Sequence, residues 1–191
     1  MPLLSRNAQV LRYLLGVAPG VGRIKLVKYA YLADCEGYRY LGRAISNFRY
    51  RFDKHGPFDR AFFDAKDELL RAGVAMESAT RIGPYNGYDY RPTTEPVEYG
   101  FTQEETEILH YVARTYLTET ATRLCEDVVY QTPPMKAAKV GERLKMETMR
   151  NEPDPLGFNL DRLLTSEASV EAGRFRPLRE AVDELRARHH S

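Results

Sequence analysis

Few residues of this chain have side chains that could do chemistry together. Cys35 and His55 could act as a nucleophile and its base, because a histidine can activate a thiolate. An activated thiolate needs partial exposure and a cationic neighbour, whereas Cys35 lies on the apolar stripe of a predicted helix. We therefore interpret Cys35 as a core residue and predict no catalytic residue. An enzyme would need polar groups that converge in one deep pocket, and the sequence does not indicate one.

Metal and nucleotide sites are not indicated either. Protein metal sites use several Cys, His or carboxylate ligands at short spacing. Asp34 and Glu36 do not provide one, because residues two apart on a helix point in different directions. The glycine-rich stretch 16–22 lacks the lysine and serine that end a phosphate-binding loop. We expect no metal and no cofactor.

The composition is that of an ordinary globular protein. Of its 191 residues 43% are hydrophobic, and the formal net charge is +1, so no global field attracts nucleic acid or an anionic membrane. Cys35 and Cys125 lie in apolar helical patterns and are expected to be reduced, buried thiols. The sequence starts without signal-peptide features, and no apolar run reaches the roughly twenty residues that cross a bilayer. We expect a cytoplasmic protein with no membrane partner.

A helix predicted from Arg23 to about Tyr40 is apolar over much of its circumference, which places it in the middle of a domain. Ile24 is expected on one of its apolar sides. The strip expected to face solvent consists of residues three or four apart, namely Lys25, Lys28, Tyr29, Leu32 and Glu36. Asp34 is expected to be buried, where a carboxylate needs a cation or several donors. Arg43 or an arginine of the next strand is the expected cation.

A half-buried strand and a tight turn follow this helix. Residues 45–53 alternate between apolar and charged side chains, with Arg49 and Arg51 on the polar side. The turn His55-Gly56-Pro57-Phe58 is predicted to lead straight into a helix over residues 57–72. Its proline suits the first helical turn, because the missing N–H is not needed there, and its phenylalanine is the expected first core anchor.

A hairpin and further helices are predicted after this unit. The segments 74–82 and 88–93 are predicted strands joined by a turn-rich loop, with tyrosines on one face. Thr102 and Glu105 form a capping box at the start of the next helix. Another helix follows, and residues 135–149 are predicted to be helical as well.

These elements predict one α+β domain over residues 1–191, predominantly helical, with a small antiparallel β-sheet or hairpin in a winged-helix-like arrangement. Within it we expect a helical core with the hairpin at 5–96 and a helical C-terminal half at 97–150. A loop and a terminal amphipathic helix are expected at 151–191.

The order and spacing of the elements between Lys25 and Gly73 are distinctive. Their key positions are Lys25, Tyr31, Asp34, Arg43, His55, Gly56, Pro57 and Phe58. In this order the region resembles the Panacea domain of the SocA-like antitoxin family, whereas the segment after Pro133 matches no part of that family. The resemblance implies a bacterial or phage-borne cytoplasmic protein without catalytic activity. Such a protein binds and neutralises a cognate toxin, or delivers a client protein to an ATP-dependent protease.

Several side chains outside the expected core stripe are candidates for binding a partner protein, because aromatic groups beside arginines are common interface anchors. They are Phe63, Leu70, Tyr85, Tyr88, Tyr90, Arg49 and Arg51. The alternative is that these side chains form a second core layer with the C-terminal helices. The sequence identifies neither the partner nor the oligomeric state.

A winged-helix DNA-binding regulator is the second function that the sequence leaves open. The helix over residues 57–72 would then enter the major groove. Its outward positions include Asp59, Asp64 and Asp67 beside its basic residues, whereas phosphate contacts need a clear positive surplus. The charges therefore argue against nucleic acid as the partner.

Overall fold

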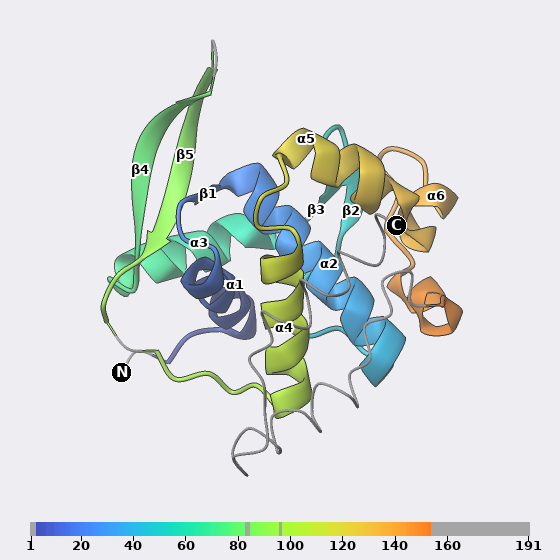
Figure 1. Cartoon of the computed structure of the whole chain (residues 1–191), viewed down its shortest axis with the longest axis horizontal. Coiled ribbons are helices and arrows are strands. Elements are labelled where there is room, and N and C mark those ends of the chain that lie inside the picture. The colour runs from blue at the N-terminus through green and yellow to red at the C-terminus, as the bar shows by residue number, and fades with distance from the viewer. Residues whose placement is uncertain (1–2, 83–84, 96, 154–191) are drawn as a thin grey trace, which may run out of the picture. The chain divides into compact units, whose positions relative to one another are not determined.

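The structure is a computed structural model that describes residues 3–82, 85–95 and 97–153 (Figure 1). The chain divides into two compact units, Met1–Asp154 and Pro155–Ser191. The second unit, and with it the expected terminal amphipathic helix, lies outside the described residues. The organisation expected for residues 1–191 as one domain therefore stays a prediction.

The described part of the first unit is helical with small antiparallel sheets, which confirms the predicted α+β class. In chain order its elements are α1 (Arg6–Val17), β1 (Val21–Gly22), α2 (Arg23–Leu41), β2 (Arg51–Asp53), β3 (Gly56–Phe58), α3 (Ala61–Arg71), β4 (Ala75–Ile82), β5 (Tyr85–Pro92), α4 (Gln103–Thr115), α5 (Ala121–Arg123), the π-helical η1 (Leu124–Val128), the 3-10 helix η2 (Val129–Gln131), α6 (Pro133–Ala137) and the 3-10 helix η3 (Met146–Asn151). No described helix has both the length and the apolar composition that crossing a bilayer requires.

Helix α2 is the central element (Figure 1). It packs against α1, α4 and η3, while α3 packs on α1. The expected solvent-facing strip of α2 is wrong, because Lys28, Tyr29 and Leu32 are at most 3% exposed. Ile24, expected on an apolar side, is exposed instead. Helix periodicity alone cannot tell on which side the later elements will pack, and here they cover nearly all of α2.

The ends of the helices follow local signals in the sequence. The Thr102 side chain accepts from the Glu105 N–H and the Glu105 side chain accepts from the Thr102 N–H, which confirms the predicted capping box of α4. Ser5 caps α1 by accepting from the Ala8 N–H. Gly42, with φ +70°, ends α2 in the left-handed conformation that favours glycine.

Two sheets flank the helices. One has the strand order β1-β5-β4, with Val21 opposite Tyr90 and Ala75 opposite Pro92. The predicted hairpin is confirmed, although its second strand begins at Tyr85 and not at residue 88. The other pairs β2 with β3, with Phe52 opposite Pro57. Pro57 therefore lies in a strand, and α3 begins only at Ala61. The prediction that the turn leads straight into a helix was wrong, because Gly56–Phe58 first turns back along β2.

The predicted strand over residues 45–53 is shorter than expected, although its alternation is correct. Only Arg51–Asp53 is strand, because the N–H groups of Ile45 and Ser46 donate to a side chain and not to a neighbouring strand. The helix predicted over 135–149 is also interrupted. Residues 138–145 run irregularly between α6 and η3, and Leu144 donates its N–H to the Tyr50 carbonyl at 2.9 Å.

Candidate functional site

Lys28, which was predicted to face solvent, hydrogen-bonds to the backbone of the turn His55–Phe58. The Lys28 ammonium donates to the carbonyl oxygens of His55 and Pro57, the latter at 3.3 Å. Gly56 has φ +93°, and a Cβ there would lie 2.9 Å from Lys28 Nζ, so only glycine fits without strain. Burial lowers the pKa of Lys28 to about 8. The His55 side chain is exposed, so the turn acts through its backbone.

Asp34 has a similar structural role six residues further along α2. Its carboxylate is 1% exposed and accepts from the N–H groups of Ile45 (2.8 Å) and Ser46 (2.7 Å), from the Ser46 hydroxyl and from the Tyr50 hydroxyl (2.9 Å). Burial raises the pKa of Asp34, and these hydrogen bonds oppose that rise. Of the two kinds of partner expected, the carboxylate has several donors and not an arginine, because Arg43 donates to Glu105 at 2.6 Å.

The remaining motif positions of α2 also connect it to other elements. The Lys25 ammonium donates to the Leu117 carbonyl at 2.6 Å. The Tyr31 hydroxyl lies 2.6 Å from Thr132 Oγ1. Phe58, expected as a core anchor, is only half-buried. Apart from the exposed His55 and the half-buried Phe58, the motif therefore holds α2 in the fold and presents few polar groups to a ligand.

The cysteines are not arranged for chemistry. Cys35 is fully buried, and burial raises the pKa of its thiol well above the usual value, which is the opposite of an activated thiolate. Cys125 is also a buried free thiol, whose sulfur donates to the His55 carbonyl at 3.7 Å. Within residues 3–82, 85–95 and 97–153, no group of three or more His, Cys, Asp or Glu side chains could hold a metal ion.

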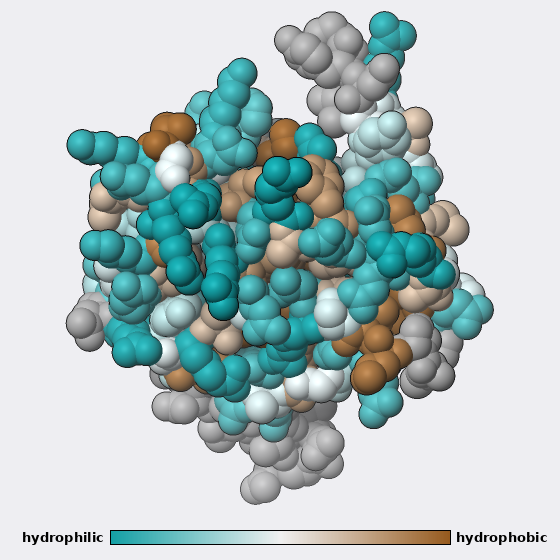
Figure 2. Space-filling view, turned by 180° about the vertical axis from the view of Figure 1, so that it is seen from behind, coloured by the Kyte–Doolittle hydropathy of each residue, from teal (hydrophilic) through white to brown (hydrophobic). Residues whose placement is uncertain are grey.

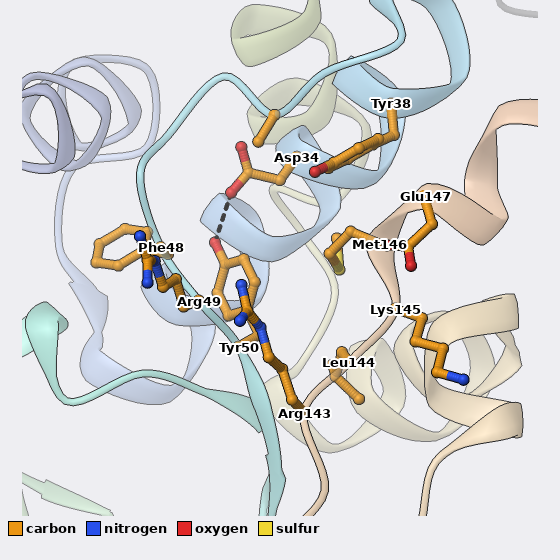
Figure 3. A pocket seen from close by; sticks show the side chains of 11 residues that line it. Asp34, Tyr38, Phe48, Arg49, Tyr50, Arg143, Leu144, Lys145, Met146 and Glu147 are labelled. Carbon is orange, nitrogen blue, oxygen red and sulfur yellow. Dashed lines mark hydrogen bonds between the residues drawn. The ribbon is translucent and has the colours of Figure 1, made fainter.

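A pocket of about 360 Å³ opens beside Asp34, between α2, segment 44–50 and segment 143–147 (Figure 3). Its floor is buried and its rim is exposed and charged. The floor consists of Asp34, Phe48, Tyr50, Leu144 and Met146, and the charged rim consists of Arg49, Arg143, Lys145 and Glu147. Four donors already occupy the Asp34 carboxylate, about as many as it can accept. The pocket is therefore better suited to binding than to acid–base chemistry.

Segment 143–145 lies beside the segment leading into β2, and this pairing brings four cationic side chains together. Arg51 lies directly opposite Arg143 in an antiparallel bridge. Side chains alternate between faces along extended chains, so Arg49 lies on the same face as Arg51 and its partner Arg143, and Lys145 follows two residues after Arg143. We call these four residues the basic strip. All four are exposed, whereas Tyr50 and Leu144 between them are buried. The two arginines named as partner-binding candidates are therefore part of a larger charged surface.

A second exposed group surrounds Phe63. The ring of Phe63 is 38% exposed, and the Arg23 guanidinium lies over it at 5.7 Å. Ile24 is 43% and Tyr88 is 52% exposed. Gly22 lies opposite Asp89, and Arg23 and Tyr88 are the chain neighbours of this pair. We call Arg23, Ile24, Phe63 and Tyr88 the aromatic patch.

The aromatic patch and the basic strip are neighbours. Phe58 lies opposite Arg51 in the β2–β3 pair, and its ring centroid is 5.7 Å from that of Phe63. On the face seen in Figure 2, hydrophobic side chains occupy several separate places among hydrophilic ones. The candidates Phe63, Arg49 and Arg51 thus lie along one connected surface, with Phe58 between the two groups.

The other partner-binding candidates lie elsewhere or inside the protein. Tyr90 is 3% exposed and Leu70 is half-buried; both line a small apolar hollow with leucines of α1. These two side chains pack inside the protein, but with α1 and not with the C-terminal helices of the alternative interpretation. Tyr85 begins β5, and its side chain lies outside the described part of the structure.

Sequence reasoning missed three residues for identifiable reasons. Lys28 was assigned to the surface because a helical wheel shows no packing partners. Arg143 and Lys145 were assigned to a helix, although the run Arg143-Leu144-Lys145-Met146 alternates charged and apolar residues. That alternation was the available signal of an extended segment, but four residues are few against the helix-forming composition around them.

Comparison with known proteins gives one match. The family model of the antitoxin SocA-like Panacea domain matches residues 26–132. No curated protein and no solved structure matches the chain. The matched range contains α2 from its fourth residue, the His55–Phe58 turn, α3, the β4–β5 hairpin and α4. The chain therefore belongs to the SocA-like antitoxins of the Panacea domain family.

Proposed function

We propose that this protein is a cytoplasmic, non-enzymatic antitoxin that binds a cognate toxin or client protein and neutralises it. The observation that carries this proposal is the family match over residues 26–132. The geometry supports it, because most of the motif residues that could have done chemistry are used in holding the fold. A partner would then meet the exposed side chains that this scaffold supports.

The aromatic patch is the proposed anchor for that partner. Aromatic and arginine side chains contribute most of the binding energy at many interfaces. The Phe63 ring packs against Phe58 and Phe62 and lies under Arg23, so little side-chain entropy remains to be lost on binding. The patch is therefore a preorganised apolar surface with a cation at its edge.

Co-expression with a small adjacent reading frame tests the function. If the adjacent product is a toxin, the wild-type chain restores growth and the two proteins copurify. We expect Phe63→Ser with Tyr88→Ser to weaken the complex by about tenfold or more. Met76→Ser is the matched control, because Met76 is 49% exposed but lies on β4 outside the patch. Equal loss in the control, or growth rescue without any complex, would contradict the proposal.

Experiments with the same two proteins distinguish an antitoxin that blocks its partner from one that delivers the partner to a protease. If the antitoxin blocks its partner, the toxin persists as a stable complex in the presence of an ATP-dependent protease. If it acts as a proteolytic adaptor, the half-life of the toxin shortens only when antitoxin and protease are both present. The measurement is the toxin half-life in cells with and without that protease.

A winged-helix DNA-binding regulator remains the second candidate, because α3 is followed by the β4–β5 hairpin. The charges of α3 oppose it. Lys66 is paired with Asp67 at 2.7 Å and lies 3.7 Å from Glu77, so this lysine is not available for phosphate, and Asp64 is exposed. Sequence-specific binding of duplex DNA that weakens steeply with salt, in the absence of any protein partner, would favour the regulator.

A further inference from the structure

The basic strip places like charges opposite each other, which an isolated protein would be expected to avoid. Arg51 and Arg143 are direct cross-strand neighbours, and Arg49 and Lys145 lie two residues further along the two segments. Like charges directly opposite each other destabilise a strand pair. A bound anion would attract both arginines and offset their mutual repulsion. The arrangement is therefore favourable when an acidic group lies over it.

The cations of the strip are available to such a ligand. Within the described residues, Arg49, Arg143 and Lys145 have no ion pair or side-chain hydrogen bond. Arg51 donates to the Gly141 carbonyl at 3.1 Å. Elsewhere on the surface Arg43 pairs with Glu105. In Figure 3, Arg49 and Arg143 lie on the Tyr50 side of the pocket, whereas Lys145 extends away from them.

The pocket beside the strip indicates what kind of anion fits. Its floor combines aromatic and apolar side chains, Phe48, Tyr50, Leu144 and Met146, so it suits an apolar side chain next to the carboxylates that the arginines would bind. Its volume of about 360 Å³ is near the lower end for ligand pockets, which suits one or two side chains of a peptide. Arginine binds carboxylates with two parallel hydrogen bonds.

The surroundings limit the length of the bound segment. Asp53 lies at one end of the strip and Glu147 lies at the pocket rim near the other. These carboxylates would repel an anionic backbone that continued past the strip, as a nucleic acid would. A short acidic segment of a protein can end between them. The observations therefore favour a protein segment over a nucleic acid.

We propose that the basic strip and the adjoining pocket bind a short acidic segment of the partner protein, with carboxylates on Arg49, Arg51 and Arg143 and an apolar side chain in the pocket. This inference rests on the proposed function in taking a protein as the partner. Arg143 and Lys145 lie beyond residue 132, where the family match ends. The basic strip thus combines two residues inside the matched range with two residues outside it. In this proposal the strip contributes to the choice of partner.

Peptide titration tests the site independently of the toxin. The probe is the acetylated and amidated pentapeptide Leu-Glu-Leu-Glu-Leu, added to the full ¹⁵N-labelled chain. We expect saturable shifts of the backbone amides of segments 49–51 and 143–147. The Gln-for-Glu peptide should bind about tenfold more weakly or worse, which corresponds to about 1.4 kcal/mol. Equal binding of the two peptides, or shifts confined to other segments, would overturn the proposal.

One substitution separates binding from folding. Arg51→Glu places a carboxylate opposite Arg143, so it should keep or raise the urea midpoint of unfolding while weakening peptide binding about tenfold. Arg81→Glu on β4 is the control with the same change of charge and should bind as the wild type does. A lowered midpoint with unchanged peptide binding would contradict the assignment.

Two further measurements distinguish the alternatives. If a 20-base-pair DNA duplex or inorganic phosphate shifts the same amides at lower concentration than the acidic peptide, the site binds phosphate and the proposal fails. If the wild-type chain neutralises a toxin and Arg51→Glu does so equally well, the proposed function stands and the acidic-segment site is wrong. If the peptide binds as expected but no toxin is neutralised, the proposed function fails alone.

Discussion

The motif region around α2 and the extended segment 143–147 use their charged side chains in opposite ways. In the motif region, Lys28 and Asp34 are buried and hydrogen-bonded to backbone groups of other segments. In segment 143–147 the charged side chains are exposed, and Arg143 faces another arginine. A recognisable motif here marks the residues that hold the scaffold together, while the groups free to meet a partner lie partly outside it. The predictions below test this contrast.

The largest expected effect comes from Asp34→Ala. The substitution leaves the buried N–H groups of Ile45 and Ser46 and the Tyr50 hydroxyl without their acceptor, so we expect a loss of about 4 kcal/mol in the free energy of unfolding. Urea unfolding followed by circular dichroism measures it. Asp127→Ala, at an exposed carboxylate, should change stability by about 0.5 kcal/mol or less. A loss below about 1 kcal/mol for Asp34→Ala would mean that the buried cluster is not structural.

Gly56→Ala is expected to have the next largest effect. The new Cβ would meet Lys28 Nζ at 2.9 Å with φ at +93°, so we expect a loss of about 2–3 kcal/mol. Gly42→Ala is the matched control. Gly42 also has a positive φ, of +70°, but a Cβ added there would have no other atom within 4 Å, so this variant should lose only about 1 kcal/mol. Equal losses at both positions would show that contact with Lys28 does not matter.

Lys28 should make stability depend on pH in the alkaline range. Burial lowers its pKa to about 8 in the folded protein from 10.5, so above pH 8 the folded state releases its proton before the unfolded chain does. Lys28 alone should therefore raise stability by about 2 kcal/mol between pH 7 and pH 9.5. Cys35 and the buried tyrosines, among them Tyr29 and Tyr31, have pKa values raised by burial, so they oppose this rise from about pH 8 to 9 upward, where the unfolded chain begins to lose first thiol and then phenol protons.

Lys28→Met isolates this contribution. Between pH 7 and pH 9.5 the stability of the wild type relative to Lys28→Met should rise by about 2 kcal/mol, whereas its stability relative to Lys136→Met, at an exposed lysine, should stay constant. Urea unfolding at several pH values gives all three curves. A difference between the wild type and Lys28→Met that does not change over this range would mean that Lys28 is not desolvated as its position implies.

The smallest effect on stability is expected at the aromatic patch. Phe63→Ser and Tyr88→Ser remove side chains that are 38% and 52% exposed, so each should cost about 1 kcal/mol or less. Thermal unfolding measures this. A stability loss as large as that of Asp34→Ala would place these rings in the core and remove the contrast between scaffold and surface.

Local signals predicted much of the fold. The capping box at Thr102 and Glu105, the glycine at position 73 with φ +68°, and the β4–β5 hairpin were all readable, because each depends on residues close in sequence. The candidate surface was predicted in part. Phe63, Arg49 and Arg51 were named, but their neighbours Arg23 and Arg143 were not, since neither periodicity nor spacing reveals contacts between distant segments.

By itself the sequence determined the elements of this protein and the family to which it belongs, because helix caps, turn glycines and apolar periodicity act over a few residues. The helix pattern predicted that Asp34 is buried, but only the tertiary structure decided its hydrogen-bond partners and the burial of Lys28. Lys28 and Asp34 hydrogen-bond to the His55–Phe58 turn and to segment 45–50, which pack over α2. Arg143 came to face Arg51 because segment 143–145 runs beside β2. The environment of a charged side chain depends on segments that are distant in sequence, so it is established only when the chain has packed.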